Sequence, residues 1–395
     1  MNITELREDF PVLHQKMIYL DSACMALKPL PVIDAMNAYY NDYTACAGRS
    51  AHDFADRVET EVLRTRRAVK DLIGAKDEKQ IIFTRNTTEG INIVASGFGL
   101  QNGDEVIISD KEHNSNLIPW LRKKKEGISV RICSSKEDNA FDLDAFDNCF
   151  TEKTKLVSLV HTSNLDGVTN PIKEIAKITH RHGALLLVDA AQSVPGRDVD
   201  VRALDVDFLS FSGHKLMGPS GTGVLYGKKD CLEKLSPLIL GGETVIDSTY
   251  DGYALESIPE RFEAGLQNYS GLIGLGAACR YIKKLGYHTI QDQEYRLNKL
   301  ITEALSTKVK LIGPGEPRKR SGIFNFMVKG LKPLDVGGML NQHKIFVRAG
   351  AHCVHSWFNK HHLPGSVRAS CYVYNTEDEM KTFIEAMHKI LKLAK

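Results

Sequence analysis

The chain has 395 residues, 43% of them hydrophobic, and its 51 basic and 49 acidic side chains leave a formal charge of +2. This balance provides no long-range field for nucleic acid or an anionic membrane. No stretch approaches the roughly 20 apolar residues of a membrane span, and the start MNITELREDF lacks the apolar run of a secretory signal, so we expect a soluble cytoplasmic protein.

The eight cysteines are scattered from residue 24 to residue 371 without a CxxC pair. Such scattering is typical of reduced thiols in a cytosolic protein rather than of a disulfide framework or a structural zinc site. We expect most of them to be small buried core residues. The chain is also longer than the roughly 250 to 300 residues at which single cores stop growing, which predicts two packed domains.

Short apolar runs alternate with longer amphipathic stretches from about residue 60 to residue 230. This pattern predicts an α/β fold with successive βα units around a mostly parallel sheet. The run ALLLVD is apolar without a break before its aspartate, which indicates a central strand buried on both faces. The expected strands are 80–84, 105–109, 155–161, 184–189, 206–211 and 223–227.

The pattern changes near residue 256, where a long helical stretch at about 270–306 precedes the segments GIFNFMV, IFVRAG and SVRASCYVY and a last helix. Thr376 followed by Glu379 predicts a capping box at the start of that helix. We expect a smaller α+β domain at 256–395, a large domain at 21–255, and an N-terminal segment 1–20 that packs on the small domain.

A lysine and an aspartate follow two of the expected strands. Lys215 lies in FSGHKLMGPSGTG, where small residues let a ligand approach the backbone, and a lysine there can form a Schiff base. A surface lysine after a turn is the alternative. Asp189 ends a buried strand, where ligands bind in open α/β sheets, and its carboxylate needs a cationic partner such as a protonated pyridine nitrogen. A helix N-cap or a metal ligand remains open for Asp189, but together the two residues indicate pyridoxal 5'-phosphate (PLP).

Two further segments place polar side chains at the same edge of the sheet. Thr87 and Thr88 lie at the start of a helix, a ready anion site, and an ordinary N-cap would explain only one of them. With Ser212 and His214 nearby, a phosphate site is expected. His113 follows the strand EVIIS, where an imidazole can lie over a cofactor ring and shuttle protons, although a surface histidine is the simpler alternative.

With these residues in place, the chain resembles the class V, fold type I PLP enzymes, and within them the group II (Suf-type) cysteine desulfurases and selenocysteine lyases. The similarity covers nearly the whole chain, from YLDSACMALKP at 19–29 through SGHKLMGPSGTGVLYGK and RFEAG to VRASCYVYNT at 367–376. Several ordered motifs together are more specific than any single one. The resemblance implies that the large domain binds PLP and that the small domain carries a catalytic cysteine loop.

The resemblance also implies roles for individual residues. Arg368 resembles the arginine that clamps the substrate carboxylate, a task that suits a bidentate guanidinium. The other implied roles are Schiff-base lysine for Lys215, partner of the pyridine nitrogen for Asp189, donor to the ring hydroxyl for Gln192, ring stacking for His113, contact with that hydroxyl and the substrate for Asn164, and the phosphate shell for Thr87, Thr88, Ser212 and His214.

The segment VRAGAHCVHSWF indicates the subclass. Cys353 matches the persulfide-forming cysteine of the family, which follows an Arg-x-Gly-x-His pattern supplied here by Arg348, Gly350 and His352. Arg348 also counts among the substrate-binding residues. A nucleophilic thiol must be partly ionised, which Arg348, His352 and His355 nearby would favour. A buried structural cysteine, or a metal ligand grouped with the histidines at 352, 355, 361 and 362, is the alternative; no familiar zinc signature is complete, so we expect no metal.

Some positions depart from the family pattern. Ala351 precedes His352 where two histidines are usual, and Val354-His355-Ser356 replaces the usual Ala-x-Pro. Leu266 stands where a threonine usually reaches the phosphate of a neighbouring subunit. Gly48 replaces an active-site histidine, although Arg49 and His52 fit the pattern.

The function implied is desulfuration of L-cysteine to L-alanine, with sulfur passing to Cys353 and then to an acceptor protein for Fe-S clusters or other sulfur-containing cofactors. By resemblance we expect a homodimer. The alternatives are a selenocysteine lyase acting on L-selenocysteine, a class V aminotransferase or epimerase on another amino acid, and a non-catalytic sulfur-carrier or metal-binding scaffold.

Overall fold

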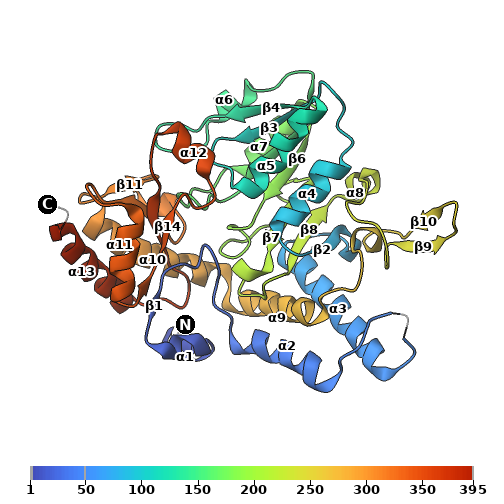
Figure 1. The fold of residues 1–395 in the computed structure, drawn as a ribbon, viewed down its shortest axis with the longest axis horizontal. Coiled ribbons are helices and arrows are strands. Elements are labelled where there is room, and N and C mark those ends of the chain that lie inside the picture. Colours follow the sequence, from blue (N-terminus) through green and yellow to red (C-terminus); the bar gives the residue numbers. More distant parts are fainter. Residues whose placement is uncertain (1–2, 49, 394–395) are drawn as a thin grey trace.

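The computed structural model describes residues 3–48 and 50–393, and its main feature is a seven-stranded mixed sheet (Figure 1). The strand order is β2-β8-β7-β6-β5-β3-β4. The strands span Ile81–Thr84 (β2), Glu105–Ser109 (β3), Ser129–Cys133 (β4), Thr154–Val160 (β5), Leu185–Asp189 (β6), Phe208–Ser212 (β7) and Gly223–Gly227 (β8). Strand β8 runs antiparallel to both of its neighbours, and the other adjacent pairs are parallel. The α/β fold and all six expected strands are therefore confirmed.

Strand β4 was not expected from the sequence. It lies at the edge of the sheet, and three of its five residues are exposed, among them Ile132. An edge strand of mixed polarity lacks the unbroken apolar run that marks a buried strand. The pairing of β4 with β3, rather than its own composition, makes it part of the sheet.

Alternate side chains of the sheet face two separate cores. Leu186 and Val188 of β6 join one core, with α3 (Asp53–Leu72), α7 (Ile172–Arg181) and α9 (Tyr269–Leu285). Leu187 joins the other core, with α4 (Thr87–Gly97) and α5 (Asn114–Lys123). The period of two along each strand produces this sandwich, and β6 is buried on both faces as its sequence predicts.

A second, four-stranded antiparallel sheet has the order β11-β12-β15-β14 and its own core. Its strands span Lys310–Ile312 (β11), Ile323–Met327 (β12), Arg348–Gly350 (β14) and Ser366–Ser370 (β15). Helices α10 (Tyr287–Leu305), α11 (Pro333–Gln342) and α13 (Glu377–Leu393) contribute to that core. The expected long helix is two helices, α9 and α10, separated at Gly286 with φ +77°.

The capping box of α13 forms as the sequence predicts. The Glu379 backbone N–H donates to Thr376 Oγ1 at 3.2 Å, and the Thr376 N–H donates to Glu379 Oε2 at 3.1 Å. These reciprocal bonds satisfy donors that a helix start otherwise leaves unpaired.

The N-terminal residues bridge the two sheets. In Figure 1, α1 (Ile3–Glu8) lies below the body of the molecule and leads into β1 (Ile18–Tyr19), which pairs in parallel with β13 (Ile345–Phe346). Leu20 belongs to the core of the second sheet, whereas Phe10 belongs to the core of the large sheet. The division into segments 1–20, 21–255 and 256–395 stays a prediction.

The remaining elements lie at the periphery. The hairpin β9–β10 (Val245–Ser248 and Tyr253–Leu255) projects from the right of the molecule in Figure 1. The other helices are α2 (Leu30–Asp42), α6 (Leu143–Asp147), α8 (Lys229–Lys234) and α12 (His355–Lys360). Among the described helices, none combines the length and apolar character needed to cross a membrane.

Candidate active site

A cavity of about 240 Å³ lies at the carboxyl ends of β6 and β7, between the large sheet and the second sheet. Every candidate residue named from the sequence lines it. The twelve are Thr87, Thr88, His113, Asn164, Asp189, Gln192, Ser212, His214, Lys215, Arg348, Cys353 and Arg368. Segments from nearly the whole chain therefore converge on one site.

Asp189 and Lys215 reach this cavity from adjacent parallel strands. Asp189 is the last residue of β6 and pairs with Ser210 of β7, and Lys215 ends the short turn that follows β7. Burial raises the pKa of the Asp189 carboxyl, and the nearby Lys215 amine lowers it. Burial lowers the pKa of Lys215, and Asp189 opposes that effect. The carboxylate of Asp189 and the amine of Lys215 therefore interact electrostatically inside the same cavity.

The surroundings of Asp189 fit a cationic ring. The side chain is 3% exposed, and its Oδ1 accepts a hydrogen bond from the Ala191 N–H at 3.0 Å. No ion pair to Asp189 is found within the part of the chain that the structure describes. An unpaired buried carboxylate costs several kcal/mol. A protonated pyridine nitrogen supplies the missing positive charge, so these residues fit PLP.

Hydroxyl groups gather at the start of α4. Thr87 Oγ1 lies 2.6 Å from Ser212 Oγ, and Thr88 Oγ1 lies 2.7 Å from Ser115 Oγ. The helix N-cap is Asn86, whose Oδ1 accepts from the Glu89 N–H, so neither threonine caps the helix. The hydroxyls and the first N–H groups of the helix are therefore arranged for an anion such as a phosphate.

Gly223 brings the start of α4 close to the sheet. A Cβ at this position would lie 2.6 Å from the Asn86 Cα, which is closer than a real contact. Only glycine at the start of β8 leaves room for the Asn86 backbone. The candidate phosphate site at the start of α4 thus depends on Gly223, which does not itself line the cavity.

His113 is the N-cap of α5, and its Nδ1 accepts from the Ser115 N–H at 3.1 Å. Burial, together with the positive charge of Lys215, lowers the pKa of His113 to about 3. His113 is therefore a neutral imidazole that lines the cavity. Its stacking on a cofactor ring stays a prediction.

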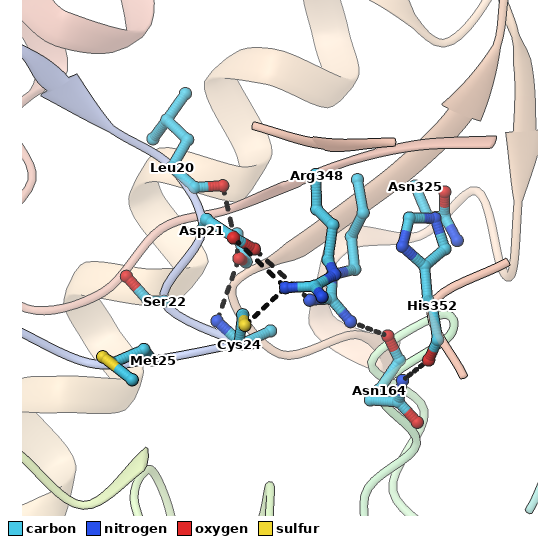
Figure 2. Close-up of polar contacts among 12 residues, drawn as sticks. Leu20, Asp21, Ser22, Cys24, Met25, Asn164, Asn325, Arg348 and His352 are labelled. Carbon is cyan, nitrogen blue, oxygen red and sulfur yellow. Dashed lines mark hydrogen bonds and ion pairs between the residues drawn. The ribbon is translucent and has the colours of Figure 1, made fainter. Parts of the chain in front are cut away.

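Arg368 lies on β15 and is 2% exposed. Its Nη1 donates to the Asn164 carbonyl at 2.9 Å, and its Nη2 lies 3.5 Å from Asp21 Oδ1. Its buried Nε has no hydrogen-bond partner in the described structure. Figure 2 shows that Asn164 in turn donates to the carbonyl of His352, which precedes Cys353. The guanidinium and the cysteine loop are thus held by the same asparagine.

Cys353 lies in a tight loop between β14 and α12. His352 and Cys353 have φ of +50° and +59°, a left-handed conformation that non-glycine residues seldom adopt. The Asn114 N–H donates to the Cys353 carbonyl at 2.7 Å, and the next residue, Val354, is buried against Trp357 and Phe358. These anchors hold the loop at the cavity.

The electrostatics beside Cys353 correct one expectation. Burial, with the charges of Arg368 and Arg348, lowers the pKa of His352 to about 2. Its Nε2 lies 2.9 Å from Ser366 Oγ. His352 is therefore neutral, so it does not favour ionisation of the Cys353 thiol through a positive charge.

Asp21 and Cys24, just after the N-terminal segment 1–20, belong to the site although the sequence reasoning gave them no role. In Figure 2, the Arg348 guanidinium lies between the Cys24 sulfur, to which its Nη1 is hydrogen-bonded, and Asp21, whose Oδ2 is 3.5 Å away. Cys24 also lines the cavity. Both lie in the quoted motif YLDSACMALKP, but no spacing in the sequence ties that segment to Arg348.

Gln192 and the departures from the family pattern lie in different places. Gln192 lines the cavity, and its Nε2 donates to the Ala23 carbonyl at 2.6 Å. Leu266 is 72% exposed and lines a second hollow. His52 is the N-cap of α3, and Arg49 lies outside the described residues.

The alternatives for the cysteines can be compared with the structure. Within residues 3–48 and 50–393, no group of three or more His, Cys, Asp or Glu side chains is placed to hold a metal ion. All eight cysteines are free thiols. Only Cys133, Cys279 and Cys371 are buried, so the expectation that most cysteines are buried is wrong.

Lys215 and the buried Asp189 line one cavity, and the start of α4 beside them can bind a phosphate. On this α/β fold, these features define a PLP-dependent enzyme. The model of the aminotransferase class-V family matches residues 18–383, and the chain belongs to this family.

Named relatives agree with this assignment. A probable cysteine desulfurase of Methanothermobacter thermautotrophicus is 39% identical over 99% of this chain and 98% of its own length. A cysteine desulfurase of Escherichia coli O8 is 37% identical over 99% of each chain. The solved apo structure of the cysteine desulfurase from Thermococcus onnurineus NA1 has a TM-score of 0.95 and 39% identity, and the match covers 98% of each chain.

Proposed function

We propose that this protein is a cysteine desulfurase that converts L-cysteine to L-alanine and transfers the sulfur to Cys353. The observation that carries the proposal is that Cys353 lines the same cavity as Lys215 and Asp189. A thiol that lines this cavity can act as a nucleophile on a substrate bound there. The full-length relatives named cysteine desulfurase support it.

When bound, PLP supplies an electron sink that stabilises negative charge at the substrate α-carbon. Lys215 attaches it and Asp189 holds the positive charge of its ring nitrogen. Thr87, Thr88, Ser212 and His214 hold its phosphate, and His113, Gln192 and Asn164 contact its ring.

Arg368 binds the substrate carboxylate in this proposal. Its guanidinium lines the cavity, and its Nε has no hydrogen-bond partner in the described structure. Asp21 balances the charge of Arg368 from a distance of 3.5 Å. Arg348, on the other side of Asp21, adds a second positive charge for an anionic substrate.

Lys215 and Cys353 carry out the chemical steps. Lys215 takes the α-proton as general base, and burial lowers the pKa of its amine, which favours that role. The Cys353 thiolate attacks the substrate sulfur; the bond from sulfur to the substrate β-carbon breaks and a sulfur–sulfur bond forms. Protonation of the β-carbon and return of the α-proton from Lys215 to the α-carbon yield alanine. The sulfur then leaves Cys353 for an acceptor protein in Fe-S cluster or other sulfur-cofactor synthesis.

We also propose a homodimer in the cytoplasm. Large apolar side chains are exposed together along one part of the chain, at Leu238, Ile239, Leu240, Ile246, Tyr250, Tyr253 and Leu266. Leu238, Ile239 and Leu266 line one hollow of about 320 Å³. A monomer rarely leaves such a surface uncovered. Eight free thiols suit a reducing compartment, and sedimentation should give twice the mass of one chain.

The test of the activity is product formation by the PLP-loaded protein. L-Cysteine should yield equimolar L-alanine and, with a thiol reductant, sulfide. Comparison of kcat/KM for L-cysteine and L-selenocysteine decides between a desulfurase and a selenocysteine lyase. 3-Mercaptopyruvate in place of alanine, or racemised cysteine without sulfide, would show an aminotransferase or an epimerase instead.

A further inference from the structure

A second cysteine shares the candidate active site with Cys353. Cys24 lies in the turn after β1, where its N–H donates to the Asp21 carbonyl at 3.0 Å. The neighbouring Ala23 N–H donates to Ser370 Oγ at 3.0 Å, which ties this turn to β15. Like Cys353, Cys24 is partly buried and its side chain lines the cavity.

The contacts of Cys24 distinguish it from the other cysteines. Its sulfur is hydrogen-bonded to Arg348 Nη1, and Figure 2 shows this sulfur directed at the guanidinium. Charge that develops on the sulfur during thiol exchange therefore lies against a fixed cation. Both Cys24 and Cys353 are also within electrostatic reach of Lys215 and Arg348.

The same cavity carries an independent sign of an anionic ligand. Arg368 Nε is buried without a hydrogen-bond partner in the described residues, so a substrate group is expected beside it. The two thiols thus line the same cavity as this unpaired guanidinium nitrogen, rather than lying on an unrelated surface.

We propose that Cys24 takes the sulfur from Cys353, so that the site holds a two-thiol relay. This inference rests on the proposed function, which first places the sulfur on Cys353. The Cys24 thiolate attacks the outer sulfur of the Cys353 persulfide. A bond from Cys24 to that sulfur forms, the sulfur–sulfur bond at Cys353 breaks, and the Cys353 thiolate takes up the proton that Cys24 released. No electrons are gained or lost overall, so no oxidant or reductant is required.

The relay provides a route out of the cavity. Met25, next to Cys24, is exposed at the surface, so the turn that carries Cys24 reaches solvent. A persulfide on Cys24 also frees Cys353 for another substrate.

The experiment follows the sulfur in the PLP-loaded protein after one equivalent of L-cysteine. Persulfides are alkylated at increasing times and located by peptide mass spectrometry. In the unaltered protein, the extra sulfur should appear on Cys353 and then on Cys24. In Cys24→Ser it should remain on Cys353, and in Cys353→Ser it should be lost from both positions. Cys231→Ser, at a partly buried thiol outside the cavity, should match the unaltered protein.

The serine variant separates sulfur transfer from a positioning role, because its hydroxyl can still accept the Arg348 hydrogen bond. If Cys24 only positions Arg348, alanine still forms, and the sulfur stays on Cys353 in every protein that retains Cys353. That result would overturn the relay. Sulfur on Cys24 in Cys353→Ser would also overturn it, since the order would be wrong. Failure to form alanine at all refutes the proposed function and the relay together.

A second measurement does not depend on turnover. Mild oxidation with diamide should join Cys24 and Cys353 in a disulfide, visible as a cross-linked peptide pair that is lost in Cys24→Ser. If these two thiols cannot be joined under conditions that oxidise the other partly buried cysteines, they cannot exchange sulfur directly and the relay is excluded.

Discussion

Asp189 ends strand β6, and Lys215 follows the end of the adjacent strand β7, so that the carboxylate and the amine face one cavity. Each shifts the pKa of the other in the direction expected for opposite charges. Parallel neighbours bring their carboxyl ends to the same edge of a sheet. In the proposed function, this shared edge lets Asp189 and Lys215 act on one bound cofactor.

Lys215→Ala should abolish the visible absorption band of the lysine-bound cofactor, because Lys215 is the one lysine among the described residues that lines the cavity. Absorption spectra of the purified protein with added PLP provide the measurement. Lys229→Ala, at an exposed lysine on α8, should keep the band. A yellow Lys215→Ala protein would mean that another residue attaches the cofactor.

Cys353→Ser should keep the absorption band but lose alanine and sulfide formation, because a hydroxyl cannot take up the substrate sulfur. The expected loss is at least about 100-fold in kcat, which is more than about 2.7 kcal/mol of barrier. Assays of both products measure it. Sulfide release at the original rate would show that Cys353 is not the nucleophile.

Arg368→Lys should raise KM for L-cysteine by about 10- to 100-fold, since a charge-assisted hydrogen bond contributes about 1.5–3 kcal/mol. A lysine cannot reproduce the bidentate geometry. Arg318→Lys, outside the cavity, should leave KM unchanged. Thermal unfolding of both variants checks that the loss of contact with Asp21 has not unfolded the protein, and an unchanged KM in folded Arg368→Lys would exclude the carboxylate clamp.

His161→Gln should reduce the sensitivity of stability to acid. Burial, with the charge of Arg197, lowers the pKa of His161 from 6.5 to about 3. As the pH falls below 6.5, His161 therefore takes up a proton in the unfolded chain but stays neutral in the folded chain. Above that pH the stability is retained, and below it the free energy of unfolding decreases by up to about 1.4 kcal/mol per pH unit.

Urea unfolding at pH 7.5 and pH 5.5, each with excess PLP, provides the comparison for His161. Unaltered protein should lose more stability between the two pH values than His161→Gln does. Glu112 and Glu294, whose pKa burial raises to about 7, act in the opposite direction in both proteins and cancel in this difference. His288→Gln, at an exposed position, should behave like the unaltered protein, and equal losses in all three would contradict the assignment to His161.

The sequence by itself determined the large sheet and the chemistry-bearing residues. Strands β3 and β8 have the expected bounds because their apolar runs are unbroken and both faces are buried. Edge strand β4 and the break at Gly286 were not predicted, since an exposed strand and a helix interruption depend on what packs beside them. Lys215, Asp189 and His113 could be named because each follows a recognisable strand, and Thr87 and Thr88 because they lie at a helix start. Gln192, Asn164, Arg368 and Cys353 were named only from the resemblance to the family.

Only the tertiary structure decided which distant residues share the cavity. Arg348 contacts Cys24 across 324 residues of chain, and Arg368 lies beside Asp21 across 347. No local sequence pattern predicts these two contacts, because they depend on how the turn after β1 packs against β14 and β15. The neutral state of His352 likewise follows from burial that the loop acquires only in the folded protein.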